Sequence, residues 1–237
     1  TIPNRLLIYR TGNKNLYPDS RPVSNPFKGK SAIVGRSFLT ETVILADSKF
    51  NTLGKLRENI LNQGIKISLA QVSKAVAALQ QESIVGSEGR SIYLLDPDKL
   101  MKELSASWKP VNKDQIYIRL PDGVKSLKKL NNSSLDWAVT GASSVNRYAN
   151  LAQSGPLKVA VSDLSKALGI LNWEKENVPN FADIELIPST ETAYYYANEK
   201  DDSGVRWANK LQVWVELNNG DARQRDVAKE IHNQIIA

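Results

Sequence analysis

The chain has 237 residues, with 31 Lys and Arg against 25 Asp and Glu and a formal net charge of +6 at pH 7. Its 41% apolar and 24% charged residues are typical of a globular protein, which excludes wholesale disorder. With no cysteine and a single histidine, His232, one chain cannot form a disulfide, a thiolate metal site, a cysteine nucleophile or a multi-histidine metal site.

The N-terminal segment, residues 1–35, carries most of the basic surplus, with six Lys or Arg and one Asp. The surplus indicates where a polyanion would bind, although a solvated arm without a partner has the same composition. Residues 5–10 predict a strand, and Pro18, Pro22 and Pro26 predict a loop over residues 11–31. Because the chain begins at Thr1, we expect the segment to be the remnant of a longer N-terminal region.

No apolar run approaches the roughly 18 residues that a membrane span needs. The chain also does not open with a basic stretch followed by an apolar one, as a signal peptide does. We therefore expect a cytoplasmic protein that is not bound to a membrane.

Residues 36–109 have helical periodicity broken by one β-prone stretch, which predicts a separate domain. Val72, Val76 and Leu79 recur at the spacing of one helix face, and Ser68 is a candidate N-cap before them. Two β-prone runs around Gly86–Gly89 predict a hairpin. The predicted helices are residues 37–47, 52–63, 68–82 and 99–108.

The order helix, helix, helix, hairpin is that of a winged helix-turn-helix domain. Residues 67–85 resemble the stretch from recognition helix to wing in bacterial winged-helix regulators. We therefore predict a recognition helix at residues 68–81 that enters the major groove of double-stranded DNA. The predicted DNA-binding residues are Lys55, Arg57, Ser68, Ala70, Gln71, Ser73, Lys74, Ala77, Ser87 and Arg90.

These residues have different predicted roles. Gln71 can read adenine through two hydrogen bonds, and Ser73 and Lys74 can reach bases or phosphates. The hairpin residues Ser87 and Arg90 are expected to contact phosphates, as are Lys55 and Arg57 near the start of the second helix. A winged helix that serves only in protein interaction or dimerisation remains an alternative.

Residues 110–237 mix strand and helix patterns, so the fold class is α+β, with a winged helix followed by a mixed α/β domain. The closing segment has the clearest helical stripe, formed by Val227, Ile231 and Ile235. The predicted strands are residues 115–120, 137–140, 157–161, 182–187, 192–197 and 211–217, and the predicted helices are residues 142–149, 162–168 and 221–236.

Three motifs of this half follow each other in a fixed order. They are Trp137-Ala-Val-Thr-Gly-Ala-Ser-Ser144, Leu211-Gln-Val-Trp-Val-Glu-Leu217 and Gly220-Asp-Ala-Arg-Gln-Arg-Asp-Val-Ala228. Together with the winged helix and the helix start Asp96-Pro-Asp-Lys-Leu100, they resemble the AbiEi-type antitoxins of type IV toxin–antitoxin systems. The charge-rich loop from Asn172 to Pro179 has no counterpart in that pattern.

The resemblance implies an autoregulating repressor that binds its operator and whose C-terminal domain counteracts a nucleotidyltransferase-like toxin. It implies no enzymatic activity and no cofactor. Symmetric regulators of this kind bind a two-fold operator as dimers. Two alternatives stay open: a plasmid-type replication initiator, which would need a second winged helix in residues 110–237, and a protein-interaction scaffold.

Enzyme signatures are weak in this chain. It contains no dinucleotide-binding glycine motif and no P-loop. The acidic pairs Asp201-Asp202 and Glu174-Lys-Glu176 lie in polar stretches that predict solvated loops. His232 follows the core position Ile231, which indicates a surface or partly packed histidine rather than a catalytic base.

Overall fold

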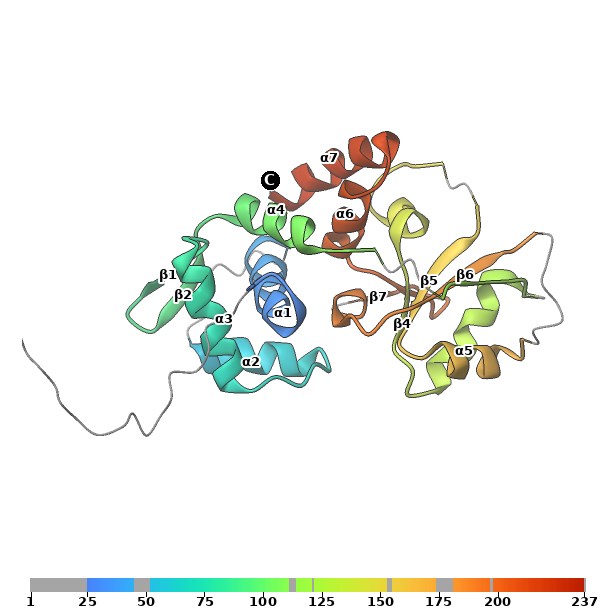
Figure 1. Ribbon diagram of the computed structural model, residues 1–237, viewed down its shortest axis with the longest axis horizontal. Coiled ribbons are helices and arrows are strands. Elements are labelled where there is room, and N and C mark those ends of the chain that lie inside the picture. The colour runs from blue at the N-terminus through green and yellow to red at the C-terminus, as the bar shows by residue number, and fades with distance from the viewer. Residues whose placement is uncertain are drawn as a thin grey trace, which may run out of the picture.

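The computed structural model describes residues 25–44, 52–110, 114–120, 122–152, 155–173, 181–196 and 198–236. They form a mixed α+β protein in which a helical part with a β-hairpin lies beside a six-stranded sheet (Figure 1). The strand predicted at residues 5–10, most of the loop predicted at residues 11–31 and the acidic residues 174–176 lie outside the described residues.

The helical part runs from residue 29 to residue 107. Its elements are α1 (Gly29–Phe38), a π-helical turn η1 (Leu39–Ile44), α2 (Leu53–Asn62), α3 (Leu69–Gln81), the hairpin β1 (Val85–Glu88) and β2 (Ser91–Leu94), and α4 (Pro97–Ser107). The helices predicted at residues 52–63, 68–82 and 99–108 are confirmed, with ends shifted by one or two residues. Thr52 and Asp96 cap α2 and α4 by accepting a first-turn amide.

The helix predicted at residues 37–47 begins eight residues earlier, at Gly29, inside the segment predicted to be loop. The prolines end at Pro26, so nothing in the backbone prevents a helix after it. Burial of Ala32, Ile33 and Val34 then stabilises the helix, which is a tertiary effect.

A capping box fixes the start of α3. Ser68 Oγ accepts the Gln71 amide at 3.2 Å, and Gln71 Oε1 accepts the Ser68 amide at 2.9 Å. The predicted inner stripe of Val72, Val76 and Leu79 is buried. The buried stripe therefore sets which side of α3 faces solvent.

The β1–β2 hairpin follows α3 after a short turn and pairs Gly86 with Tyr93. A Cβ atom at Gly86 would lie 2.7 Å from Cζ of Tyr93, so only glycine allows this ring to cross the hairpin. The Gly89 turn that closes the hairpin carries Arg90 at its exposed tip.

The six-stranded sheet has the order β3-β6-β5-β4-β8-β7. The β5–β6 and β4–β8 pairs are parallel and the other pairs antiparallel. A 3-10 helix η2 (Gly123–Asn132) and α5 (Leu164–Leu171) share an apolar core with the strands. The strands are β3 (Ile116–Ile118), β4 (Trp137–Val139), β5 (Leu157–Val161), β6 (Ile184–Pro188), β7 (Glu199–Lys200) and β8 (Arg206–Trp207).

Two predictions for this half are wrong. Residues 211–217, predicted as a strand, lie in α6 (Lys210–Asn218), where all seven are buried. A helix buried on every side has no amphipathic period, so its sequence looks like that of a buried strand. The strand predicted at residues 192–197 contains the 3-10 helix η4 (Thr192–Tyr194). The helix predicted at residues 142–149 is confirmed as the 3-10 helix η3 (Gly141–Arg147).

One hydrophobic core crosses the domain boundary predicted at residues 109/110. Leu100, Met101 and Leu104 of α4 belong to the same buried cluster as α6 and α7 (Ala222–Ile236). Ser105, itself 2% exposed, accepts hydrogen bonds from the side chains of Asn218 and Asn219 at 2.8 and 2.9 Å between Nδ2 and Oγ. The C-terminal helices therefore pack on the helical part as well as on their own half.

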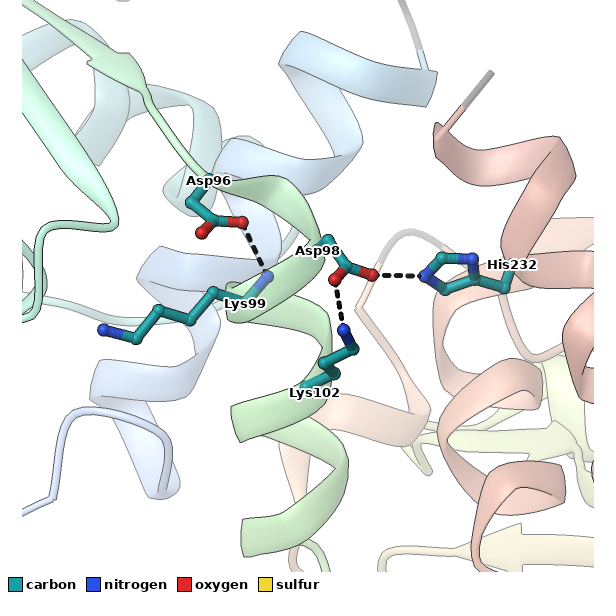
Figure 2. A network of polar contacts seen from close by, with 5 residues as sticks. All are labelled: Asp96, Asp98, Lys99, Lys102 and His232. Atoms are coloured by element: carbon teal, nitrogen blue, oxygen red, sulfur yellow. Dashed lines mark hydrogen bonds and ion pairs between the residues drawn. The ribbon is translucent and has the colours of Figure 1, made fainter.

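A polar contact on the surface joins the same two regions (Figure 2). His232 Nε2 on α7 lies 2.8 Å from Oδ1 of Asp98 on α4, and Asp98 also accepts a hydrogen bond from Lys102. The bond from the Lys102 ammonium and that with His232 hold the pKa of Asp98 below its usual value. The single histidine thus joins α7 to α4 through a hydrogen bond.

Candidate nucleic-acid interface

A groove of about 470 Å³ lies between the start of α2, the outer face of α3 and the tip of the hairpin. Ser73 and Ala77 of α3 line it from one side, Arg90 from the hairpin, and Thr52 and Gly54 from α2. The structure thus brings three predicted DNA-binding residues from two separate elements onto one concave surface.

Nine of the ten predicted residues are exposed: Lys55, Ser68, Ala70, Gln71, Ser73, Lys74, Ala77, Ser87 and Arg90. Arg57 differs, because its side chain is half-buried and its Nε donates to the carbonyl oxygen of Ile67 at 3.1 Å. That bond holds the loop between α2 and α3 and uses one of the five guanidinium donors, so the phosphate contact predicted for Arg57 stays a prediction.

Gln71 is exposed, but its amide oxygen is already used by the capping box of α3. Bidentate recognition of adenine needs both the oxygen and the NH₂ group of a glutamine. In this conformation only the NH₂ group is available, so reading adenine through two bonds requires the cap to open. The sequence indicates this use of the Gln71 oxygen, since Ser and Gln three residues apart form a capping-box pattern.

The cations of this surface have no carboxylate partner among the described residues. In the described part of the chain, Lys55, Lys74 and Arg90 take part in no ion pair within 4.0 Å. The acidic residues on the same elements, Glu58 and Glu88, are exposed and lower the net charge. Unpaired cations are available to phosphates without first breaking an intramolecular bond.

Leu69 is an apolar residue of this surface that the sequence prediction did not include. It is 50% exposed at the first position of α3 and lines the groove together with Leu53 and Ile92. Leu69 lies three residues before Val72 and therefore fits the spacing of the buried stripe. No pattern in the sequence marks it as exposed.

A buried carboxylate lies in the other half of the molecule. Glu216 on α6 accepts hydrogen bonds through Oε1 from the Thr140 hydroxyl and, at 2.8 Å, from Nε2 of Gln212. Gly141, at φ +59°, leaves room for it, since a Cβ there would lie 3.0 Å from Oε2 of Glu216. Burial raises the pKa of Glu216, an effect partly opposed by these hydrogen bonds and by the charges of Lys158 and Arg36.

Replacing Glu216 by glutamine is expected to change how stability depends on pH. Because the carboxyl pKa is higher in the folded state than its ordinary value of about 4.3, the unfolded chain releases this proton first as pH rises. The wild-type protein then loses stability relative to Glu216→Gln, by about 1.4 kcal/mol for each unit of pKa difference. Denaturant unfolding at pH 5 and pH 8 measures how much the free energy of unfolding changes with pH, and the exposed Glu230→Gln is the control. An equal change for wild type, Glu216→Gln and Glu230→Gln would contradict the prediction.

Among the described residues, no three His, Asp or Glu side chains are grouped closely enough to hold a metal ion. Within the same residues, no helix has the length and apolar character needed to cross a membrane. Comparisons with known protein families, with curated proteins and with solved structures find no match to this chain.

Proposed function

We propose that the protein is a DNA-binding transcriptional regulator that docks α3 into the major groove of double-stranded DNA. The observation that carries the proposal is the shared surface of α3 and the hairpin, where Ser73 and Arg90 line one groove and Lys74 forms no ion pair with any described residue. In this proposal α2 and α3 form the helix-turn-helix and the β1–β2 hairpin is the wing.

The antitoxin role remains part of this proposal and rests on the resemblance to AbiEi-type antitoxins. Two of the motifs behind that resemblance meet in space, because Thr140 of the first donates to Glu216 of the second. The motifs therefore belong to one buried network, which supports treating them as parts of a single structural unit. Its proposed partner is a nucleotidyltransferase-like toxin.

Fluorescence anisotropy tests the DNA-binding proposal. The probes are labelled duplexes that tile the DNA upstream of the protein's own gene, with shuffled duplexes of the same composition as control. We expect one upstream duplex to bind at least about a thousandfold more tightly than shuffled DNA at physiological salt. Equal affinity for all duplexes would contradict a sequence-specific regulator.

Arg90→Ala is expected to weaken binding to all DNA sequences by a similar factor. Arg90 lies at the exposed hairpin tip, where its guanidinium can neutralise one phosphate. Loss of one phosphate contact reduces the slope of log K against log salt by about 1. Titrations from low to moderate salt measure the slope, and the exposed Lys125→Ala on η2 serves as control; a slope equal to that of wild type would remove Arg90 from the interface.

A second candidate function is protein interaction through the same groove, which the exposed Leu69 and the apolar side chains of Leu53 and Ile92 favour. Leu69→Ser distinguishes the two candidates, because it removes apolar contact area without changing charge. Under the DNA-binding proposal its affinity for the upstream duplex stays near that of wild type. The replication-initiator alternative lacks structural support, because in the described part of residues 114–236 no pair of α-helices is followed by a β-hairpin.

A further inference from the structure

A second concave site in the helical part shares no lining residue with the groove at α3. It is a cavity of about 290 Å³ between the first turns of α1, the end of α4 and the segment after β6. Charged side chains gather around it: Lys28, Lys30 and Arg36 come from α1 and its N-cap, and Glu191 comes from the segment after β6.

Arg36 is the unusual member of this set. It is only 2% exposed, and its Nε and Nη1 atoms have no hydrogen-bond partner among the residues that the structure describes. In the described part of the chain no carboxylate oxygen lies within 4.0 Å of its guanidinium. Burial lowers its pKa to about 10, while the more distant charges of Glu191 and Glu216 oppose the shift.

A buried guanidinium without a partner is costly, so buried charges in proteins are normally paired. Binding of an anion would offset this cost, because the anion would pair with the buried guanidinium charge of Arg36. The planar guanidinium is suited to bind the oxygens of a phosphate or carboxylate through two parallel hydrogen bonds.

The helix that carries Arg36 adds donors at the same place. Gly29, Ala32, Ile33 and Arg36 recur at the spacing of one helix face, and all four line the cavity. Helical side chains lean toward the N-terminus of their helix, which directs Arg36 toward the first turn. No side chain caps that turn, and its amide groups carry the positive end of the helix dipole.

We propose that this cavity binds a small ligand with a phosphate group, held by Arg36 and by the first-turn amides of α1. Three cations against one carboxylate favour a divalent anion such as a phosphomonoester over a monovalent carboxylate. Ile33, Leu104 and Trp108 form apolar parts of the wall that can contact the organic portion of the ligand. The volume limits that portion to a few carbon atoms, because cavities for drug-sized ligands begin at about 300 Å³.

The site contains residues from both halves of the chain, since Glu191 and Ala193 follow the sheet strand β6 while the other named residues belong to α1 and α4. A bound phosphate would therefore stabilise the folded full-length chain through mass action. This proposal is independent of DNA binding.

Thermal unfolding of the full chain tests it, with inorganic phosphate and glycerol 3-phosphate as probes. Glycerol and potassium chloride at matched ionic strength are the controls. We expect the melting temperature to rise with each phosphate probe in a saturable manner and to stay unchanged with glycerol. No phosphate-specific rise would overturn the proposal.

Arg36→Met is the decisive variant, because it keeps most of the side-chain volume and removes the buried charge. We expect it to melt no lower than wild type without phosphate, and its Kd for glycerol 3-phosphate in calorimetry to rise at least about tenfold. The exposed Lys125→Met, on η2 and outside the cavity, is expected to bind as wild type does.

Lys30→Met provides a second variant that leaves the core intact, since Lys30 is exposed. We expect it to weaken phosphate binding several-fold at low salt, less than Arg36→Met does. If Arg36→Met and Lys30→Met both bind phosphate as tightly as wild type, the cavity is not the site. If Arg36→Met does not fold, the Lys30→Met result alone decides, and unchanged binding overturns the proposal.

Discussion

A protein made of residues 110–237 alone is expected to expose apolar surface and to lack the cooperative unfolding transition of the full chain. Helix α6 is buried on all sides, and part of that burial comes from Leu100 and Leu104 of α4, which the fragment lacks. Each large apolar side chain that becomes exposed costs about 1.5–3 kcal/mol, against a typical total stability of about 5–15 kcal/mol. Losing several such contacts, together with the bonds to Ser105, is enough to unfold α6 and α7.

Dye binding to exposed apolar surface, circular dichroism and size-exclusion chromatography measure this. The control is the full chain with a protease site inserted at residues 111–113, cleaved after folding. Because the core crosses the cut, we expect the two pieces to elute together and to separate only in denaturant. A monodisperse 110–237 fragment that melts as the full chain does would show that the boundary at residues 109/110 divides two independent domains.

This expectation also decides how the antitoxin proposal must be tested. A fragment that fails to fold says nothing about which half neutralises a toxin. Point variants at exposed residues of the full chain, such as Arg90→Ala, test the activities without disturbing the shared core.

Gln71→Glu is expected to abolish DNA binding while the fold remains intact. Glutamate at this position completes the same capping box with Ser68 and is favoured by the dipole at the helix N-terminus, by about 0.3–1 kcal/mol. The stability of α3 should therefore be equal to or slightly above that of wild type. A carboxylate on the face that enters the groove repels phosphates and cannot donate to adenine, so we expect at least about a hundredfold loss of affinity.

Gln71→Ala is the matched variant. It removes the side-chain half of the capping box as well as the base contact, so its effect on binding mixes helix stability with recognition. We expect it to cost about 1–3 kcal/mol on the specific duplex and little on shuffled DNA. Melting temperatures of both variants, measured with anisotropy on both duplexes, separate the two contributions. Full DNA binding by Gln71→Glu would show that the outer face of α3 does not lie in a DNA groove.

Local sequence determined the elements of residues 52–107. The candidate cap Ser68 and the spacing of Val72, Val76 and Leu79 predicted where α3 begins and which side it buries, and in the structure Thr52 and Asp96 cap α2 and α4 in the same way. Capping and amphipathic spacing are properties of a few neighbouring residues, so the chain carries them without reference to the rest of the fold.

Sequence reasoning failed where burial from distant segments decides the structure. Residues 211–217 are buried on every side because α6 is surrounded by α4, α7 and η3, and a buried segment without an amphipathic period does not distinguish a helix from a strand. The early start of α1 has the same origin, since packing of Ile33 and Val34 stabilises a segment that the nearby prolines made look like loop.

The exposed face of α3 was therefore determined by the sequence itself, through the period of its core residues. Only the tertiary structure decided which of these side chains are free to act. It tied Arg57 to the carbonyl of Ile67 and, among the described residues, left Nε and Nη1 of the buried Arg36 without a hydrogen-bond partner at the junction of the two halves. Hydrogen bonds and burial join residues that are far apart in the chain, and no local pattern records them.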